Sequence, residues 1–575
     1  MKKFLSYAGP YKKDLILAII CIEAETVFEL IIPMVMADII DAGVPRGDVR
    51  YILLKGLQMV LFALISLVLG HGCAKYTARC GSGIAAEIRT AEFEKMQSYS
   101  FENTDRFNTS SLVTRMTSDV TTIQNSVTNG MRPGFRSPVM MLTAVIVSFA
   151  MNAKLALVFL VAAPILGICL FFIVKNVRPL YAKMQGAVDH VNRIVQENLT
   201  AIRVVKAYVR EDYETEKFAE VNDNLRQTSE KAFKLAAFNM PAFQLVMYAT
   251  ILCILWFGGG MVMVGDMKVG ALMSFLSYIL QVLNSLMMFS NVFLLFTRSL
   301  ASWRRISQVL EEEPTINDDR AKELVIRKGG IRFENVCFKY KENAREYVLS
   351  DISFAIKPGQ TVGILGQTGA AKTTLVQLIP RLYEATSGQI YIDGHPIYEY
   401  TQAHLRDAIA MVLQKNTLFS GTVEENLRWG KEDATQEEID RACRIACVDE
   451  FIDRLDNGYQ TELGQGGVNV SGGQKQRLCI ARAILKQPKI FILDDSTSAV
   501  DTATEAKIRE GLREAFPEIT TIIISQRVSS LMDADQIIVL DDGKISGIGN
   551  HNTLLGQNEI YQDIFQLQQK GGEPA

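Results

Sequence analysis

The feature that most constrains this chain is a run of 20 uncharged residues, LALVFLVAAPILGICLFFIV, at positions 155–174. A helix needs about 20 mostly apolar residues to cross the hydrocarbon core of a bilayer. Residues 242–264 and 269–297 are likewise uncharged and qualify outright. Three further stretches qualify less strictly: one holds a single lysine (Lys55), one is short, and one holds three glutamates. The sequence therefore predicts six membrane spans, near residues 15–37, 52–72, 133–151, 155–174, 242–264 and 269–297.

The three glutamates of the first predicted span are Glu23, Glu25 and Glu29. Charged groups at membrane depth are costly and often functional. They could form an inward-facing site for a cationic or polar substrate. Alternatively, they could face a water-filled vestibule or reach toward the interface without contacting substrate. The sequence leaves both interpretations open.

The loops between the spans predict the orientation of the chain. Two connections are long and rich in lysine and arginine, and the N-terminal tail contains Lys2, Lys3, Lys12 and Lys13, which places both termini in the cytosol. The long connections alternate apolar and charged residues at helical spacing. An arm of about 30 residues would extend about 45 Å beyond the membrane. Reversals near Asn103–Ser110 and Arg210–Glu216 would lie at the tips, where they could touch a cytosolic domain.

The composition changes after Arg298, where the apolar spans stop. We expect a transmembrane domain at 1–298, a charged linker at 299–328 and a second domain at 329–575. In the second domain, short β-rich runs alternate with helical stretches, which predicts an α/β architecture with a largely parallel central sheet. The net charge of −3 gives no reason to expect a nucleic-acid partner.

The stretch TVGILGQTGAAKTTLVQLI, residues 361–379, has the pattern of a strand, a glycine-rich loop and a helix. Backbone N–H groups of such a loop cradle phosphates, while Lys372 would bind the outer phosphates and Thr373 a Mg²⁺ ion. Ala371 occupies the position of the last glycine of the usual pattern. An alanine is expected there only if its φ is negative and its methyl group clears the phosphate. The predicted binding residues are Gly366, Gln367, Thr368, Gly369, Ala370, Ala371, Lys372, Thr373 and Thr374.

Further motifs follow in a characteristic order, and with them residues 329–567 resemble the nucleotide-binding domain of an ABC transporter. NVSGGQKQRLCIARAI, at 469–484, is similar to the family's signature motif, and FILDD, at 491–495, to its Walker B strand. Ser498–Asp501 resembles the D-loop. The resemblance implies that Tyr340 stacks on adenine, that ATP is bound with Mg²⁺, and that Thr373, Gln414 and Asp494 serve the metal. The signature residues are Ser471, Gly472, Gly473 and Gln474.

The whole chain resembles a bacterial ABC exporter half-transporter, which implies a fold class in two parts. An all-α domain of six transmembrane helices with long cytosolic extensions would precede an α/β nucleotide-binding domain. The chain would be a multi-pass protein of the bacterial plasma (inner) membrane, embedded in the lipid bilayer, with its nucleotide-binding domain in the cytosol. Its cargo would be small amphipathic molecules.

The sequence departs from the family at two catalytic positions. Asp495 stands where a glutamate usually polarises the attacking water, and Gln526 where a histidine usually contacts the γ-phosphate. In this family each ATP lies between the phosphate loop of one chain and the signature motif of another. We therefore expect a heterodimer in which this chain's own site hydrolyses ATP slowly or not at all. Its signature motif would complete a competent site on a partner that carries the glutamate and the histidine. The alternatives are a homodimeric lipid or peptide exporter with slow ATPase, and a nucleotide-gated channel or regulator.

Overall fold

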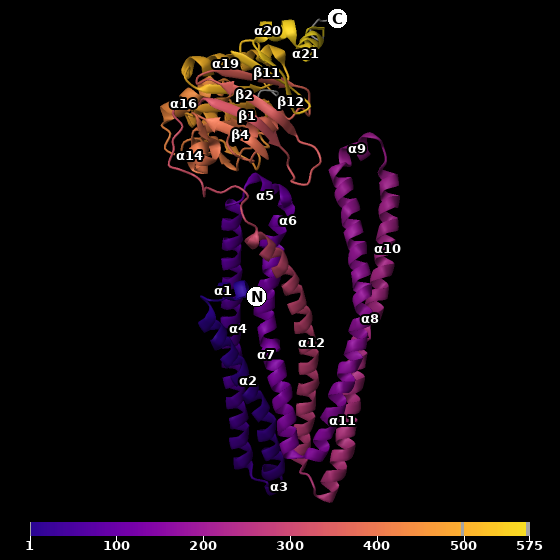
Figure 1. Ribbon diagram of the computed structural model, residues 1–575. Coiled ribbons are helices and arrows are strands. Elements are labelled where there is room, and N and C mark those ends of the chain that lie inside the picture. The colour runs from indigo at the N-terminus through magenta and orange to yellow at the C-terminus, as the bar shows by residue number, and fades with distance from the viewer. Residues whose placement is uncertain (1, 496–499, 571–575) are drawn as a thin grey trace. The chain divides into compact units, whose positions relative to one another are not determined.

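The computed structural model describes residues 2–495 and 500–570, and the chain divides into two compact units. Unit 1 consists of Met1–Gln97 and Thr109–Glu311. Unit 2 consists of Ser98–Asn108 and Glu312–Ala575, so it contains a short piece of the first long connection between predicted spans. Figure 1 labels the elements of both units.

Unit 1 is entirely helical in its described residues, as expected for long apolar segments that must satisfy their backbone hydrogen bonds internally. Prolines inside the helices, such as Pro33, Pro138 and Pro164, do not end them. The helices are α1 (Lys2–Tyr7), α2 (Lys12–Asp38), η1 (Ile39–Gly43), α3 (Val44–Arg46), α4 (Val49–Gln97), α6 (Thr109–Thr114), η2 (Arg115–Asp119), α7 (Val120–Met151), α8 (Ala153–Thr200), α9 (Ile202–Ala207), α10 (Glu211–Ala237), α11 (Asn239–Val264) and α12 (Val269–Glu311).

Five helical stretches among the described residues are long and apolar enough to cross a membrane. They are Val49–Gln97, Thr109–Met151, Ala153–Thr200, Glu211–Val264 and Val269–Glu311. The first predicted span does form a helix, α2, but it is not among these five, and it contains the three glutamates. The count of six spans is therefore not confirmed by length and composition.

Two of the three glutamates form ion pairs that the sequence analysis did not predict. Glu25 on α2 bonds to Arg132 on α7 at 2.5 Å, and Glu29 bonds to Arg136. Both pairs repeat after four residues, so each helix presents its two charges on one face. This neutralisation favours a structural role for Glu25 and Glu29 over direct binding of a cationic substrate.

Helices α8 and α10 form a two-helix arm that reverses at α9. They pack along each other, and Figure 1 shows them diverging from α4, α7 and α12 toward that reversal. The turn lies between Thr200 and Glu211, a few residues before the predicted one. Its tip exposes apolar side chains: Tyr208 is 75% exposed and Val209 80%.

Unit 2 contains a six-stranded sheet in the order β12-β11-β3-β10-β9-β6. The five strands from β11 to β6 are mutually parallel, and β12 is an antiparallel edge, which confirms the prediction of a largely parallel sheet. The five residues of β9 are all buried, which explains why its sequence is a nearly continuous apolar run. The strands are β3 (Thr361–Gly366), β6 (Ile409–Val412), β9 (Ile490–Asp494), β10 (Thr520–Ile524), β11 (Gln536–Asp541) and β12 (Lys544–Gly549).

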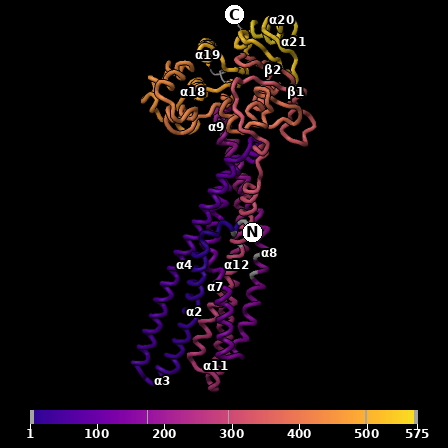
Figure 2. Tube along the Cα trace, turned by 60° about the vertical axis from the view of Figure 1, so that its left-hand side comes forward, coloured from indigo at the N-terminus to yellow at the C-terminus, as the bar shows by residue number. Residues whose placement is uncertain are grey.

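A second sheet, in the order β2-β1-β4-β5, shares a hydrophobic core with strands β3, β9 and β10. Another core joins the central sheet to α15, α16 and α18. Figure 2 shows α18 on one side of the unit and β1 and β2 on the other. The remaining strands are β1 (Ile331–Phe338), β2 (Leu349–Ile356), β4 (Ser387–Ile392), β5 (His395–Pro396), β7 (Gly421–Thr422) and β8 (Glu462–Leu463). The helices are α5 (Phe101–Arg106), α13 (Lys372–Gln377), α14 (Gln402–Asp407), α15 (Val423–Arg428), α16 (Gln436–Ile445), α17 (Asp449–Ile452), α18 (Gly472–Leu485), α19 (Thr502–Ala515), α20 (His551–Gln557) and α21 (Glu559–Lys570), with 3₁₀ turns η3 (Ile397–Glu399), η4 (Gly458–Gln460) and η5 (Val528–Ser530).

Candidate nucleotide site

The predicted phosphate loop follows strand β3 and leads into α13, as the sequence pattern indicates. Strands β3 and β9 both pair with β10 in parallel, so their carboxyl ends, at Gly366 and Asp494, lie at the same edge of the sheet. Gly366 admits no side chain, because a Cβ there would stand 2.4 Å from the carbonyl oxygen of Leu540. At Gly369, where φ is +91°, a Cβ would meet nothing within 4 Å, so the loop is open on that side.

Ala371 has a φ of +67° and a ψ of 25°, so the expectation of a negative φ is wrong. The loop needs a left-handed residue directly before α13, and this chain places an L-residue with a Cβ there. The cost of that conformation is about 1–2 kcal/mol. The surrounding sheet and helix hold the backbone in the glycine conformation despite the substitution.

Two side chains of the loop donate hydrogen bonds within the site. The Nζ of Lys372 donates to the carbonyl oxygens of Gly366, at 2.7 Å, and Gln367, at 2.8 Å. The hydroxyl of Thr373 donates to Oδ1 of Asp494 at 2.9 Å. Burial lowers the pKa of Lys372, with Asp495 and Asp494 opposing the shift.

Asp494 has the surroundings of a metal ligand. It is 1% exposed, and its Oδ2 atom accepts no hydrogen bond from the described residues. Burial raises its pKa to about 6. The hydroxyl of Thr373 and an unsatisfied carboxylate oxygen form an oxygen donor set of the kind that Mg²⁺ takes beside nucleotide phosphates. The residues present therefore fit Mg²⁺ and a phosphate chain, and when bound the ion would neutralise phosphate charge.

The two residues that depart from the family contact each other. Nε2 of Gln526 donates to Oδ2 of Asp495 at 3.2 Å. Burial raises the pKa of Asp495, while hydrogen bonds with Gln526 and Gln414 oppose that shift. Asp495 is therefore held beside the phosphate loop by the amide of Gln526, and Gln414 comes within reach of the same carboxylate. Of the D-loop resemblance, Ser498 and Ala499 lie outside the described residues.

Tyr340 follows strand β1 and contacts α13, the helix after the phosphate loop. The resemblance places the adenine ring on this tyrosine. Its side chain is partly exposed, and its hydroxyl is 2.9 Å from that of Thr374. Its ring packs edge-on against Phe338 and Tyr383, with centroid distances of 4.9 and 5.2 Å. Tyr340, Phe338 and Tyr383 thus form an aromatic surface beside the helix that follows the phosphate loop.

The signature residues form a helix N-terminus of their own. Ser471 caps α18, its hydroxyl accepting from the N–H of Gln474 while the Gln474 side chain accepts from the N–H of Ser471. Gly472 and Gly473 form the first turn, whose free N–H groups and helix dipole favour an anion. In the part of the chain that the structure describes, no hydrogen bond joins this motif to residues 366–374. The contacts that link the other predicted site residues do not include the signature.

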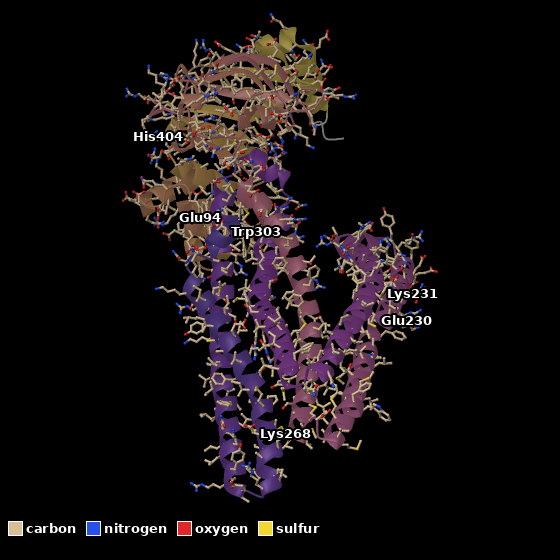
Figure 3. All side chains as sticks on the ribbon, turned by 60° about the horizontal axis from the view of Figure 1, so that its bottom comes forward. Glu94, Glu230, Lys231, Lys268, Trp303 and His404 are labelled. Carbon is tan, nitrogen blue, oxygen red and sulfur yellow. The ribbon has the colours of Figure 1, made fainter. Side chains whose placement is uncertain are left out.

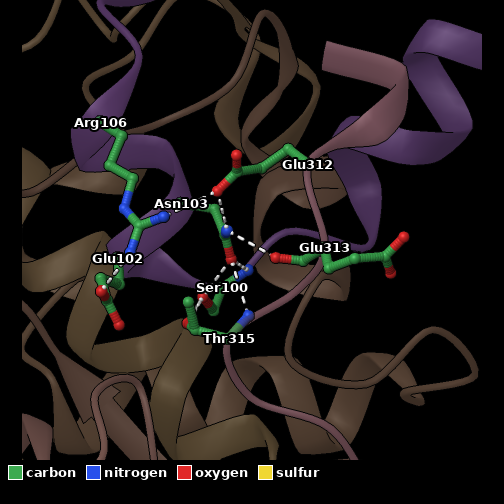
Figure 4. Close-up of polar contacts among 7 residues, drawn as sticks. All are labelled: Ser100, Glu102, Asn103, Arg106, Glu312, Glu313 and Thr315. Atoms are coloured by element: carbon green, nitrogen blue, oxygen red, sulfur yellow. Dashed lines mark hydrogen bonds and ion pairs between the residues drawn. The ribbon is translucent and has the colours of Figure 1, made fainter. Parts of the chain in front are cut away.

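A buried asparagine on α5, not predicted from the sequence, fixes residues 98–108 to residues 312–315, which directly follow α12 (Figure 4). Asn103 is fully buried and donates to Oε1 of Glu312 and to the carbonyl oxygen of Glu313, at 2.8 and 2.9 Å. Its side-chain Oδ1 accepts from the N–H of Thr315 at 3.1 Å. Arg106 adds an ion pair with Glu312. Only the predicted reversal near Asn103 hinted at this contact.

Residues 98–108 also reach the aromatic surface of the site. The hydroxyl of Tyr383 donates to Oδ2 of Asp105 at 2.6 Å, and the ring of Phe101 lies 6.0 Å from that of Tyr383. Tyr383 in turn contacts Tyr340. A chain of contacts therefore runs from the predicted adenine-binding residue to residues 98–108.

Comparison with known proteins agrees with this geometry. Residues 15–286 match the model of the ABC transporter transmembrane region, and residues 349–498 match that of the ABC transporter domain. Over 570 residues the chain is 40% identical to the Bacillus subtilis (strain 168) protein named "Uncharacterized ABC transporter ATP-binding protein YfiB", covering 99% of this chain and 98% of that one. The chain belongs to the ABC transporter family. It joins a helical transmembrane region to an ABC domain, and this domain implies transport coupled to ATP hydrolysis.

Two further similarities cover almost the full length. The chain is 31% identical over 579 residues to the Bacillus subtilis (strain 168) protein named "Putative multidrug export ATP-binding/permease protein YgaD", covering 99% of both. A solved structure of a bacterial Atm1-family ABC exporter with ATP bound superposes with a TM-score of 0.82 at 24% identity, covering 98% of this chain and 99% of that one. The similarity to this solved structure supports the fold.

Proposed function

We propose that this ABC transporter chain is one half of an ATP-driven exporter of small amphipathic molecules in the bacterial plasma membrane. In this proposal α2 is the sixth span. It has 27 residues, which as a helix extend about 40 Å, enough to cross the bilayer. The ion pairs with Arg132 and Arg136 support this placement, because pairing lowers the cost of burying Glu25 and Glu29.

The site on this chain's own phosphate loop binds ATP and hydrolyses it slowly. The observation behind this is the hydrogen bond between Asp495 and Gln526. The carboxylate is one methylene shorter than a glutamate, and the residue facing it is an amide, which cannot exchange a proton at neutral pH. A positioned general base typically contributes ~10²–10⁴-fold in rate. Lys372, Thr373 and Asp494 nevertheless retain the groups that bind phosphate and Mg²⁺.

The partner in this proposal is a second half-transporter with glutamate and histidine at the two positions. Ser471–Gln474 of this chain would face the partner's ATP, because they form the N-terminus of α18, which favours an anion. The exposed tip at Tyr208 and Val209 would contact the partner's cytosolic domain. Closing two such domains on ATP would then reorient the helices, since both phosphate loops and both signatures are engaged only in the closed state.

Support for the cargo class comes from similarity to YgaD, whose name concerns multidrug export, and from the composition of the spans. Methionines such as Met247, Met287 and Met288 lie in α11 and α12, and flexible thioether side chains suit apolar ligands of varied shape.

The test compares ATP hydrolysis by the purified chain alone with hydrolysis by the chain co-purified with candidate partners, in lipid vesicles. We expect slow turnover by the chain alone and a large, cargo-stimulated rate in the pair. Brisk turnover and cargo movement by two copies of this chain would contradict the division of labour and favour a homodimeric exporter. ATP-dependent ion conductance without cargo movement would favour a channel.

A further inference from the structure

One carboxyl group in unit 1 is buried without a hydrogen-bond partner. Glu92, near the end of α4, is 0% exposed, and neither of its carboxyl oxygens has a hydrogen-bond partner among the described residues. An ionised carboxylate in such surroundings would lose its hydration with nothing to replace it, which is strongly unfavourable. A neutral carboxylic acid loses far less. The geometry therefore favours a bound proton on Glu92.

The charged groups around Glu92 are engaged elsewhere. Asp119 of η2 accepts from the guanidinium of Arg305 and, at 2.9 Å, from the hydroxyl of Ser302, both on α12. Arg89, one turn before Glu92 on α4, donates to the carbonyl oxygen of Met116 at 3.2 Å. Arg115 of η2 donates to the carbonyl oxygen of Arg305 at 2.7 Å. Three arginines and one aspartate thus hold α4, η2 and α12 together without bonding to the Glu92 carboxyl group.

The pKa of Glu92 agrees with this geometry. Burial, the largest cause, and Asp119 raise the pKa of Glu92, Arg115 and Arg89 oppose the shift, and together they bring it to about 7. The group lies outside the membrane, because it stands 20 residues beyond the apolar stretch that ends near residue 72, or about 30 Å along the helix. Figure 3 agrees, since Glu94 and Trp303 lie at the end of the helical bundle opposite to Lys268, which is in a short loop between two spans.

The segment that faces Glu92 is a natural place for rearrangement. Residues Arg115–Asp119 form a turn of π-helix between α6 and α7. Turns of π-helix are rare and occur frequently at functional sites. Directly after this turn, Val120 of α7 packs with Ile88 of α4 and Ile306 of α12 in one apolar cluster. A shift of η2 relative to α4 would admit water to Glu92.

We infer that Glu92 is a proton-binding site whose occupancy favours the packed arrangement of α4, η2 and α12. When these elements separate, the carboxyl group meets water and regains its ordinary acidity, so the separated arrangement releases the proton. Proton binding at Glu92 thus makes the separation of α4, η2 and α12 dependent on cytosolic pH. This inference does not depend on the heterodimer or on the cargo.

The direction and range of the effect follow from linkage. The group holds its proton more tightly in the packed arrangement, so that arrangement is favoured most below the ordinary glutamate pKa of 4.5. Its advantage falls as the pH rises from 4.5 and is fully lost above about 7. Between pH 5 and pH 8 the ratio of separated to packed molecules should rise roughly 10–100-fold.

The first experiment detects the proton directly. Infrared spectra of the full chain in lipid vesicles are recorded from pH 5 to pH 8, with glutamate carboxyl carbons labelled with ¹³C so that glutamic acid bands separate from those of Asp494. We expect a protonated glutamic acid band that titrates near neutral pH. It should disappear in Glu92→Gln and persist in Glu94→Gln, a matched change at an exposed glutamate two residues away. Absence of the band in the wild-type chain, or its persistence in Glu92→Gln, would overturn the inference.

The second experiment measures the arrangement. Amide hydrogen exchange of residues 84–96 and 115–123 is followed over the same pH range and corrected for intrinsic exchange rates. We expect protection to fall with rising pH in the wild type and in Glu94→Gln, and to stay constant in Glu92→Gln, whose amide is always neutral. If Glu92→Gln failed to fold, the wild-type chain would still decide the matter, because protection that is independent of pH refutes the linkage.

Discussion

Replacing Asp495 with glutamate tests whether a short carboxylate limits ATP hydrolysis at this site. The substitution extends the side chain by one methylene, about 1.5 Å. A positioned base contributes ~10²–10⁴-fold. Two features favour the lower end of that range: Gln526 remains in place of histidine, and residue 495 has a φ of +44°, a conformation that glutamate tolerates less well than aspartate. We expect hydrolysis at this site to rise about 10²-fold, equivalent to about 3 kcal/mol of barrier.

The assay must report this site alone. The chain is therefore combined with a partner whose own catalytic glutamate is replaced by glutamine, and phosphate release is measured at saturating Mg-ATP. Asp495→Asn, which keeps the length of the side chain but removes the base, serves as the control and should not rise above the wild type. If Asp495→Glu changes the rate by less than twofold, the short carboxylate does not limit this site.

Three further outcomes follow from the structure. Ala371→Gly removes the strain of a left-handed alanine but raises the entropy of the unfolded chain, so the free energy of unfolding should rise by about 1 kcal/mol. In calorimetry the Tm should then rise about 2–4 °C. The control Ala370→Gly, at a buried neighbour, should lower the Tm. Arg132→Gln leaves buried Glu25 unpaired and should lower the stability by about 3 kcal/mol. Glu25→Gln should lower it much less, because Arg132 is partly exposed. The double variant should regain stability in thermal unfolding. Mg-ATP affinity measured by calorimetry should fall as the pH drops below about 6, because Asp494, whose raised pKa is about 6, then binds a proton instead of the metal.

The nucleotide site could be predicted from sequence because its parts follow the ends of parallel strands. Lys372 and Asp494 are far apart along the chain, but β3 and β9 end at the same edge of one sheet, so the motifs converge wherever that sheet forms. The conformation of Ala371 could not be predicted in the same way. An alanine suggests a negative φ, and only the geometry of the loop before α13 shows that the backbone position overrides the residue.

The ion pairs of unit 1 were not predictable from hydropathy. Glu25 and Arg132 lie 107 residues apart, and hydropathy alone does not say which helices become neighbours. The hydrogen bonds of Asn103 with residues 312–315 were unpredictable for the same reason, because they depend on how α5 packs against those residues. The same ambiguity hid Glu92, whose sequence context of alternating charges is typical of an exposed helix, while the structure buries it completely.

The most direct measurement of the division of labour compares two variants of this chain within the paired transporter. Ser471→Ala alters the signature that would face the partner's ATP, and Lys372→Ala alters this chain's own phosphate loop. If bond cleavage occurs beside the partner's glutamate, Ser471→Ala should abolish most of the steady-state ATPase and transport, while Lys372→Ala should leave a substantial part of both. Equal losses from the two substitutions would contradict an unequal division and indicate that this chain's own site turns over.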